Sequence, residues 1–477
     1  MYYQRVLSGI SGLDEVLKGG FIPNRFYLIR GKSGTGKSTL GLYFLLEGIK
    51  SKEKVLYITL EESETKIRKN AELKGIDLNG IEFLDISPTS EYFAKVQAYD
   101  IFSSVEVERE PLTKAIVEKV KSLNPKRIFL DSITQFKLLC SDTYQCRKMI
   151  LSFLRFLTEA NATVLFTSEI SKQISDDDLI FISDGVLKLD YDGKLRTIQI
   201  EKFRGSGYSN GLHSLKISDK GIEVFPKIYY MGRKIEYKKE ILSSGISEID
   251  NTLGGGIEKG TINIITGPSG TGKTTLSLCF LREAALQGKK VFFYSFDEDL
   301  EFILERCKAI NMDLNGVKDN LILFKIPPSL YTIEEFFYIL KNDIEKYKPE
   351  IIALDSIPSL QNSFLKSIDK IELSLLTKNL KNFGISLIII NETELEPGQI
   401  KLPEDEITFL ADNIIFLHHI IIEGQIKKIF GLLKKRLSDF DKSLREFEIT
   451  KDGIKIGSPL KNFKGFSLGI PEITKNL

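Results

Sequence analysis

The sequence predicts two tandem α/β domains, each with a mostly parallel sheet flanked by helices, and three observations support this. The chain has 477 residues, enough for two domains that each bury a sizeable core. A Gly-rich motif occurs twice, as GKSGTGKST at 31–39 and GPSGTGKTT at 267–275, which places Lys37 and Lys273 236 residues apart. Short apolar runs alternate with amphipathic segments in both halves, the pattern of a parallel sheet covered on both faces.

The predicted strands recur in the same order in both halves. The first is a short apolar run before the Gly-rich motif, which is followed by an apolar-periodic helix at 40–49 and again at 276–286. The second strand is expected to end in paired acids, the third in LDS, and the fourth in a glutamate. As pairs from the two halves, the strands are 26–30 and 262–266, 55–62 and 291–298, 127–132 and 351–356, and 163–169 and 386–392.

The least regular segment, 226–240, carries charge and a proline and has no apolar period. It is the natural joint, so we expect domains at 1–230 and 231–477.

Composition and charge bound the class of protein. The chain has 66 Lys and Arg residues against 65 Asp and Glu, so nothing suggests bulk attraction to nucleic acid or anionic lipid. No apolar run approaches the roughly 18 residues of a membrane span, and the N-terminal residues lack a signal-peptide layout. We therefore expect a cytoplasmic protein and do not expect a membrane or nucleic acid as its partner.

Three groups of reactive side chains are assigned no site. The cysteines form no C-x-x-C pair, so reduced thiols are expected rather than metal or disulfide use. The run of three aspartates at 176–178 is interpreted as a solvated loop rather than a metal site. The histidines show no ligand spacing. These residues are Cys140, Cys146, Cys279, Cys307, His213, His418 and His419.

Both Gly-rich motifs follow a predicted strand and open a predicted helix, which is the context of a phosphate-binding loop of the Walker A type and not of a chance turn. Its backbone N–H groups converge on phosphate oxygens, and glycine is needed where a Cβ would block that approach. We expect Lys37 and Lys273 to bridge the β- and γ-phosphates of ATP, and Ser38 and Thr274 to bind Mg²⁺. The expected nucleotide-binding residues are Ser33, Gly34, Thr35, Gly36, Lys37, Ser38, Thr39, Ser269, Gly270, Thr271, Gly272, Lys273, Thr274 and Thr275.

Asp131 and Asp355 each end a four-residue apolar run and precede a serine. A carboxylate at the C-terminal end of a parallel strand lies on the ligand-binding edge of the sheet, where it can hold the Mg²⁺ shell. The alternative is an ordinary strand-ending Asp that caps the next helix. The positions, 94 and 82 residues after the two loop lysines, favour the metal role.

Paired acids follow the second strand of each half: Glu61 with Glu62, and Asp297 with Glu298. Hydrolysis needs a carboxylate to orient or deprotonate the attacking water, and neighbouring acids on a strand point in alternate directions. We favour Glu62 and Glu298, since Glu occupies that position in both halves. The alternative is a solvated acidic strand end.

A K-x-R element occurs late in each half, as Lys202 with Arg204 and Lys434 with Arg436. Strand alternation places both cations on one side, where they can neutralise charge on a γ-phosphate as an arginine finger does. Because they lie far along the chain from the phosphate loops, a neighbouring subunit is the expected recipient. The alternative is a basic edge strand that discourages aggregation.

Together these features resemble the KaiC family of tandem RecA-like ATPases, in its archaeal and bacterial members. The resemblance rests on SGISGLDEVLKGG and SSGISEIDNTLGGG at the two domain entries, both phosphate loops, the paired acids, LDS twice, KFRGSG at 202–207, and KKRLSDFDKSLREFEIT at 434–450. It covers nearly the whole chain. Each domain is therefore expected to be a RecA-like P-loop domain.

The resemblance implies a homo-hexameric double ring with ATP at the subunit interfaces, Mg²⁺ as cofactor, slow hydrolysis and signalling or regulatory protein partners. It matches the two K-x-R elements to positions that contact the neighbour's nucleotide, and Glu61, Glu62 and Glu298 to the catalytic acids. Asp297 is a conservative departure, and Leu437 replaces a glycine after the second K-x-R element.

The clock proteins of this family carry an adjacent Ser and Thr that are autophosphorylated. The segment ITFLADNI, 407–414, aligns with that region and offers Thr408 followed by Phe409. Phe409 has no acceptor oxygen, so a two-site cycle is not expected. Thr408 is left as a candidate phosphoacceptor for Ser/Thr autokinase activity in the second domain.

The leading hypothesis is thus an ATP-hydrolysing, ring-forming nucleotide switch. The alternative from another class is a DNA-dependent ATPase related to recombinases and helicases, which the balanced charge and the lack of an extra domain disfavour. A scaffold that uses ATP only to assemble is disfavoured by the acids and K-x-R elements of both halves.

Overall fold

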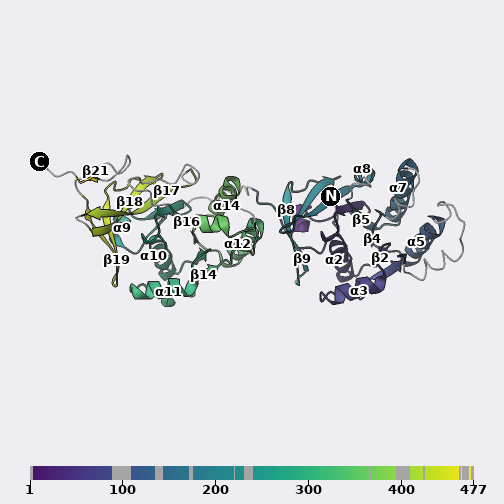
Figure 1. Ribbon diagram of the computed structural model, residues 1–477, viewed down its shortest axis with the longest axis horizontal. Helices are drawn as coiled ribbons and strands as arrows, with labels where there is room; N and C mark the ends of the chain where they lie inside the picture. The colour runs from purple at the N-terminus through teal and green to yellow at the C-terminus, as the bar shows by residue number, and fades with distance from the viewer. Residues whose placement is uncertain are drawn as a thin grey trace. The chain divides into compact units, whose positions relative to one another are not determined.

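The computed structural model describes residues 4–88, 109–134, 143–170, 176–219, 221–229, 240–365, 368–393, 409–422, 425–460, 463–464 and 472–473. The chain packs as two compact units, Met1–Lys227 and Ile228–Leu477, called here the first and second unit. Figure 1 shows both units and labels many of their helices and strands.

The described residues of the first unit form a nine-stranded sheet in the order β3-β2-β4-β5-β1-β6-β7-β8-β9. The strands from β3 to β6 in that order are parallel, and β6 to β9 continue the sheet as antiparallel neighbours. The strands are β1 (Phe26–Gly31), β2 (Val55–Thr59), β3 (Glu82–Asp85), β4 (Arg127–Asp131), β5 (Thr163–Glu169), β6 (Gly185–Tyr191), β7 (Arg196–Phe203), β8 (Leu212–Ser218) and β9 (Gly221–Phe225). The helices are α1 (Leu13–Val16), α2 (Lys37–Lys50), α3 (Glu64–Glu72), α5 (Arg109–Leu123), α7 (Thr143–Glu159) and α8 (Asp177–Ile182).

The second unit repeats this topology as β14-β13-β15-β16-β12-β17-β18-β19-β20, parallel as far as β17 and antiparallel beyond it. Its large sheet contains β12 (Ile262–Gly267), β13 (Val291–Ser295), β14 (Leu321–Lys325), β15 (Ile351–Asp355), β16 (Ser386–Glu392), β17 (Asn413–Ile422), β18 (Gln425–Lys435), β19 (Arg445–Thr450) and β20 (Gly453–Pro459). Short pairs are β10 (Ile241–Leu242) with β11 (Ile257–Glu258), and β21 (Phe463–Lys464) with β22 (Glu472–Ile473). The helices are α9 (Ser247–Thr252), α10 (Lys273–Leu286), α11 (Leu300–Ala309), α12 (Ile333–Tyr347), α13 (Ile357–Asn362), α14 (Lys370–Asn382) and the 3₁₀ turn η1 (Asn315–Val317).

Helices cover both faces of each sheet, because consecutive strand residues pack into different cores. In β1, Tyr27 and Ile29 lie in the core beneath α2, whereas Phe26 and Leu28 lie in the core that contains residues of α5 and α7. In the second unit β12 divides in the same way between a core with α10 and a core with α12 and α14. Figure 1 shows α2 and α10 each lying against its own sheet. The predicted fold, two tandem RecA-like α/β domains, is confirmed.

Two expectations about local structure were wrong. The paired acids do not end a strand, because β2 stops at Thr59 and β13 at Ser295. The hydroxyl of each of these residues donates to the backbone carbonyl three residues on, at Glu62 and Glu298, which closes a turn. The aspartate run is solvated only in part: Asp176 is buried and accepts a hydrogen bond from Ser168, whereas Asp177 is exposed, and Asp177 and Asp178 begin α8 instead of lying in a loop.

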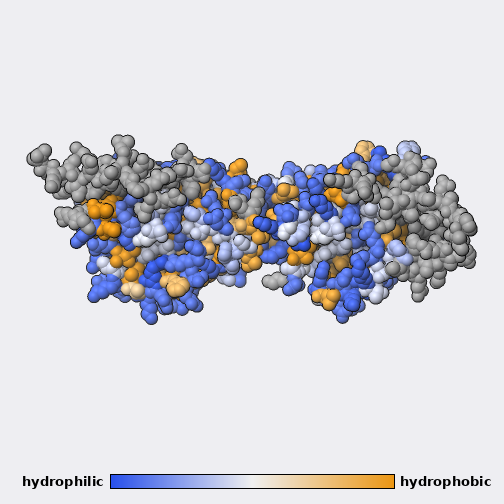
Figure 2. All heavy atoms as spheres, viewed as in Figure 1, coloured by the Kyte–Doolittle hydropathy of each residue, from blue (hydrophilic) through white to orange (hydrophobic). Residues whose placement is uncertain are grey.

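The visible surface is mainly hydrophilic, with separate hydrophobic residues scattered over it (Figure 2). No helix in the described part of the chain is long and apolar enough to cross a membrane. Cys279 and Cys307 are free and buried in the second unit, where burial raises the pKa of Cys279 to about 12 and that of Cys307 to about 11.

Candidate nucleotide-binding sites

Each Gly-rich motif forms the turn between a central strand and the helix that follows it. In the first unit the turn joins β1 to α2, with φ of 77° at Gly34 and 106° at Gly36. Gly270 and Gly272 adopt 77° and 107° between β12 and α10. These left-handed conformations favour glycine, and a Gly-rich turn at a helix N-terminus presents backbone N–H donors that suit a phosphate group.

The loop lysines curl back over their own loops. Lys37 Nζ donates to Gly31 O at 2.9 Å and Lys32 O at 2.8 Å, and Lys273 Nζ donates to Pro268 O at 2.7 Å. Burial lowers the pKa of both lysines, which nearby carboxylates oppose. A phosphate oxygen at this position would replace neutral carbonyl acceptors with charged ones, so the site fits an anion.

A hydroxyl and a carboxylate meet beside each loop. Ser38 Oγ donates to Asp131 Oδ2 at 2.6 Å, and Thr274 Oγ1 donates to Asp355 Oδ2 at 2.6 Å. Asp131 and Asp355 are the last residues of β4 and β15, so the strands carry them to the edge where the loops lie. One carboxylate, one hydroxyl and the oxygens of a bound phosphate form a donor set that suits Mg²⁺.

The two carboxylates differ in their surroundings. Asp131 also accepts hydrogen bonds from Tyr57, at 3.1 Å, and from Thr167. Burial raises the pKa of Asp355 to about 6, and the hydrogen bond from Thr274 opposes that shift. In the second unit burial therefore opposes the charged form of the Asp355 carboxylate.

The paired acids face the same cavities as these groups. In the first unit Glu61 accepts a hydrogen bond from Ser132, and Glu62 forms an ion pair with Lys66 at 2.7 Å. In the second unit Glu298 accepts from Arg306 at 2.6 Å and 2.9 Å, while Asp297 accepts a hydrogen bond from Lys325 at its backbone carbonyl.

A cavity brings the phosphate loop, the strand-end Asp and the acids together in each unit. The first has a volume of about 370 Å³ and the second about 660 Å³. Both are lined by the loop lysine, the hydroxyl, the Asp and the acid pair. Further lining residues that the sequence reasoning missed are Lys74, Glu169, Arg196, Arg306, Glu392 and Lys428.

The signal for some of these residues was present in the sequence. Glu169 and Glu392 end β5 and β16 at matching positions, as Asp131 and Asp355 do on the neighbouring strands. In contrast, Arg196 reaches the first cavity only because β7 pairs antiparallel to β6, and such a register is not visible in one sequence.

The K-x-R elements lie level with the start of the central parallel strand, at the end away from the phosphate loop. Arg204 N donates to Asp184 O, and Asp184 N donates to Phe26 O, so Arg204 is level with the first residue of β1. The phosphate loop begins five residues later, about 17 Å along the strand. Lys202 and Arg204 are not among the described residues that line the first cavity.

Both cations of the first element bind to the same helix end. Lys202 Nζ donates to Ile180 O at 2.7 Å and Phe181 O at 2.9 Å, and Arg204 Nη2 donates to Phe181 O at 3.4 Å. The end of α8 therefore holds both side chains on one side of the strand.

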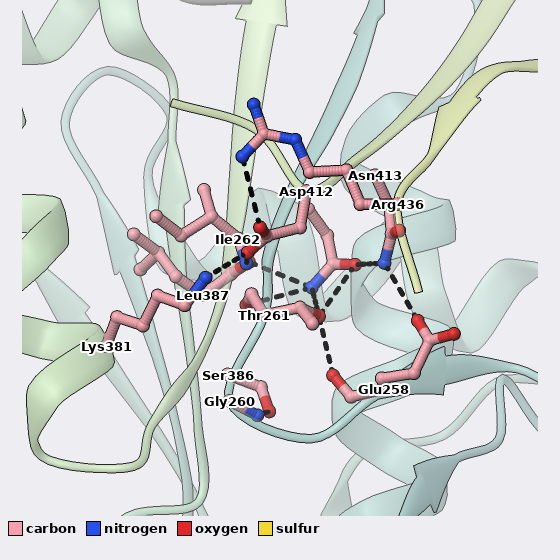
Figure 3. Close-up of polar contacts among 11 residues, drawn as sticks. Glu258, Gly260, Thr261, Ile262, Lys381, Ser386, Leu387, Asp412, Asn413 and Arg436 are labelled. Atoms are coloured by element: carbon pink, nitrogen blue, oxygen red, sulfur yellow. Dashed lines mark hydrogen bonds and ion pairs between the residues drawn. The ribbon is translucent and has the colours of Figure 1, made fainter. Parts of the chain in front are cut away.

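In the second unit the strand register is the same, but a carboxylate holds the arginine. Arg436 N donates to Asp412 O, and Asp412 N to Ile262 O. Figure 3 shows Arg436 and Lys381 directed at Asp412, whose carboxylate is 3.6 Å from Arg436, 2.6 Å from Lys381 and 2.9 Å from Ile262 N.

The sequences around both sites match one known protein family. A protein-family model described as "ATPase: KaiC" matches the chain twice, at residues 6–229 and 242–461. The chain belongs to the KaiC family of ATPases. The match spans both nucleotide-binding cavities, so each unit is a KaiC-type, ATP-binding P-loop ATPase domain.

Several proteins named "Circadian clock oscillator protein KaiC" are similar over almost their full length. The protein of Parasynechococcus marenigrum is 28% identical over 491 residues, covering 99% of this chain and 94% of its own. That of Nostoc sp. is 27% identical over 485 residues, covering 98% and 92%. That of Synechococcus elongatus is 27% identical over 482 residues, covering 97% and 91%.

Three further expectations for this KaiC-family chain concern single positions. Thr408 lies outside the described residues. Leu437 is exposed and, unlike Gly205 with φ of 81°, is not among the described residues with positive φ, so the backbone differs after the two K-x-R elements. His213 accepts a hydrogen bond from Lys227 N at 2.8 Å, which is a structural contact.

Proposed function

We propose that this KaiC-family chain is a Mg²⁺-dependent ATP hydrolase that turns over slowly and acts as a nucleotide switch. Each domain, 1–230 and 231–477, is proposed to hold one ATP. The observation that carries the proposal is the convergence, in one cavity of each unit, of the loop lysine, the hydroxyl–carboxylate pair and an acid pair.

The residues of each site divide the work of holding the triphosphate. Loop amides and the ammonium group of Lys37 or Lys273 bind the β- and γ-phosphate oxygens and orient the γ-phosphate. Ser38 with Asp131, and Thr274 with Asp355, hold the Mg²⁺ shell. Mg²⁺, when bound, neutralises charge on the β- and γ-phosphates.

A carboxylate that lines each cavity is proposed to act on the attacking water. Glu62 and Glu298 serve as general bases that accept a proton from the water, and Glu61 and Asp297 support them. Their place in the turn after β2 and β13 gives these acids access to the cavity that also contains the loop lysine.

The active assembly is proposed to be a homo-hexameric double ring with ATP at the subunit interfaces. The strand register supports this, because it puts Arg204 and Arg436 about 17 Å along the strand from their own phosphate loops. A head-to-tail contact that closes on rotation brings the K-x-R element of one subunit to the nucleotide of the next. Lys202, Arg204, Lys434 and Arg436 then stabilise charge on the γ-phosphate in trans.

Two finer points follow the family resemblance. The second domain is proposed to have single-site Ser/Thr autokinase activity directed at Thr408. The protein is proposed to be cytoplasmic and to signal through protein partners. Mass spectrometry after incubation with ATP and Mg²⁺ tests the first point, since a phosphate on Thr408 adds a defined mass to one peptide.

The hydrolysis proposal is tested by the double variant Glu62→Gln/Glu298→Gln. General-base catalysis contributes about 10²–10⁴-fold, so turnover should fall by at least about 100-fold while ATP still binds. Undiminished turnover would exclude these acids as bases. Mass measurement of the ATP-bound protein at low concentration tests the ring, and a persistent monomer would exclude the trans cations.

A further inference from the structure

The two proposed general bases have different neighbours on the helix that follows each of them: Lys66 matches Phe302, and Asn70 matches Arg306. Matching the phosphate-loop lysines of the two units aligns Glu62 with Glu298 and, eight residues further along, Asn70 with Arg306. Asn70 is in α3 and Arg306 is in α11, the helices that follow the acids. A cation thus stands in the second unit where the first has a neutral amide.

Arg306 grips both oxygens of Glu298. Its Nη1 donates to Oε1 at 2.6 Å and its Nη2 to Oε2 at 2.9 Å, a bidentate pair. Arg306 Nε is buried and has no acceptor among the described residues, so Glu298 supplies the hydrogen bonds that orient the guanidinium. Both side chains line the cavity that also contains Lys273 and Asp355.

In the first unit no described residue holds both oxygens of Glu62 in this way. Lys66 reaches only Oε1, at 2.7 Å, and its side chain is 62% exposed, which marks a weak surface pair. Asn70 and Glu62 line one small cavity beside the phosphate loop, together with Lys74, so the residue that matches Arg306 is neutral there. Lysine also forms a point contact, whereas arginine matches the fork of a carboxylate.

We infer that Arg306 is a positioning residue that withholds Glu298 from the attacking water and thereby slows hydrolysis in the second unit. This inference rests on the proposed role of Glu298 as general base. To accept a proton, Glu298 must turn an oxygen lone pair toward the water near the γ-phosphate, and the planar guanidinium holds its carboxylate toward α11 instead. The ion pair must therefore loosen before the base can act.

The size of the effect follows from exposure. The side chains of Arg306 and Glu298 are 40% and 35% exposed, so solvent screens the pair and its strength is that of a good surface pair. Releasing it is expected to raise second-unit turnover about two- to fivefold. The competing role for Arg306, direct binding of the γ-phosphate, predicts the opposite sign, because its loss would then weaken binding or lower turnover.

The test is a cycle of four proteins in a Glu62→Gln background, which suppresses the first unit: no further change, Arg306→Asn, Glu298→Gln, and both together. Arg306→Asn should raise kcat about two- to fivefold with KM unchanged. The rise in kcat should vanish in the Glu298→Gln background.

Two further variants serve as controls. Arg306→Lys should give an intermediate kcat, because a lysine contacts one carboxylate oxygen. Arg282→Asn, on the far part of α10, is the matched loss of an arginine and should leave kcat unchanged.

Placing an arginine at the matching position of the first unit gives a second, independent test. In a Glu298→Gln background, Asn70→Arg should lower first-unit kcat by a similar factor, because it places a guanidinium beside Glu62. A fall in kcat or a rise in KM with Arg306→Asn would overturn the inference in favour of phosphate binding, and a gain that persists without Glu298 would also overturn it. The proposed function fails separately, if Glu298→Gln leaves second-unit turnover unchanged.

Discussion

The hydroxyl of Ser38 lies 2.6 Å from the carboxylate of Asp131, although 93 residues separate the two in the chain. Thr274 and Asp355 are joined at the same distance in the second unit. P-loop NTPases hold Mg²⁺ with a loop Ser or Thr and a strand-end Asp, so we predict that each pair serves one metal shell.

Asp131→Asn should therefore weaken Mg²⁺ use in the first unit. Removing one supporting carboxylate of a metal site typically costs 10–100-fold in metal affinity or activity, and we expect a shift of that order in the Mg²⁺ concentration for half-maximal turnover. The measurement is a Mg²⁺ titration of ATP hydrolysis in a Glu298→Gln background. Asp178→Asn, an acid of α8 paired with Arg147, is the control. An unchanged titration curve would remove Asp131 from the metal shell.

Asp355 is predicted to make nucleotide-free protein less stable at neutral pH. Its folded pKa, about 6, lies above the ordinary value of 3.8, so the folded state binds more protons than the unfolded state between those values. Stability from this group is therefore present below about pH 4 and lost as pH rises through 6. In metal chelator, Asp355→Asn should stabilise the second unit at pH 7, by at most roughly 3 kcal/mol, and not at pH 4.

Urea unfolding at both pH values measures this difference. The exposed Asp319→Asn is the control and should change neither value. Equal effects of Asp355→Asn at pH 4 and pH 7 would contradict the pKa argument.

Gly41 in α2 is predicted to be intolerant of a side chain. A Cβ there would lie 2.1 Å from Cζ of Phe129, which β4 places beneath the helix. Overpacking of this kind costs typically about 1–3 kcal/mol, which exceeds the helix-propensity gain of roughly 1 kcal/mol, so Gly41→Ala should destabilise the first unit. The control Gly207→Ala has open space around it.

The clash should be relieved by a smaller partner. The second unit has Ser277 and Ala353 at the positions that match Gly41 and Phe129. Denaturant unfolding should therefore show that Phe129→Ala costs less in the Gly41→Ala background than in the parent. If the two costs are additive, the aromatic ring of Phe129 moves away from the new Cβ in the Gly41→Ala variant without being removed.

The parts of the fold that depend on short sequence segments were predicted. Apolar runs such as 26–30 read as strands because both faces are buried, and the loop glycines were recognised because positive φ and close phosphate approach are local needs. The turn after β2 was missed. There the hydroxyl of Thr59 donates to Glu62 O, and this contact overrides the strand period that the apolar residues suggested.

Contacts between distant segments were not predictable from one sequence. The antiparallel strands β8 and β9, and β19 and β20, carry no motif that announced them. A role for Arg306 was not predictable, because it depends on the 2.6 Å contact with Glu298. The turn after β13 and the start of α11 together create that contact. The distance of Arg204 from its own phosphate loop likewise depends on strand register, although the chain separation had suggested it.

The distance between Arg204 and its own phosphate loop leads to a complementation prediction for the first site. One chain carries Arg204→Ala and a second carries Lys37→Ala, both in a Glu298→Gln background, and each alone should have little first-unit turnover. When the two are mixed, an interface can combine an intact phosphate loop from one chain with an intact arginine from the other. Random assembly through a head-to-tail contact makes about a quarter of the interfaces of this kind, so about a quarter of the parent turnover should return.

The control replaces the second chain with one carrying both Lys37→Ala and Arg204→Ala. Its mixture with the Arg204→Ala chain has intact phosphate loops but no intact Arg204, so turnover should stay low. Mass measurement of the mixture establishes that the chains have assembled together. If mixed rings form and the mixture of Arg204→Ala and Lys37→Ala chains regains no turnover, Arg204 serves its own subunit. The distance of about 17 Å along the strand between Arg204 and Gly31 would then have to be spanned within one chain.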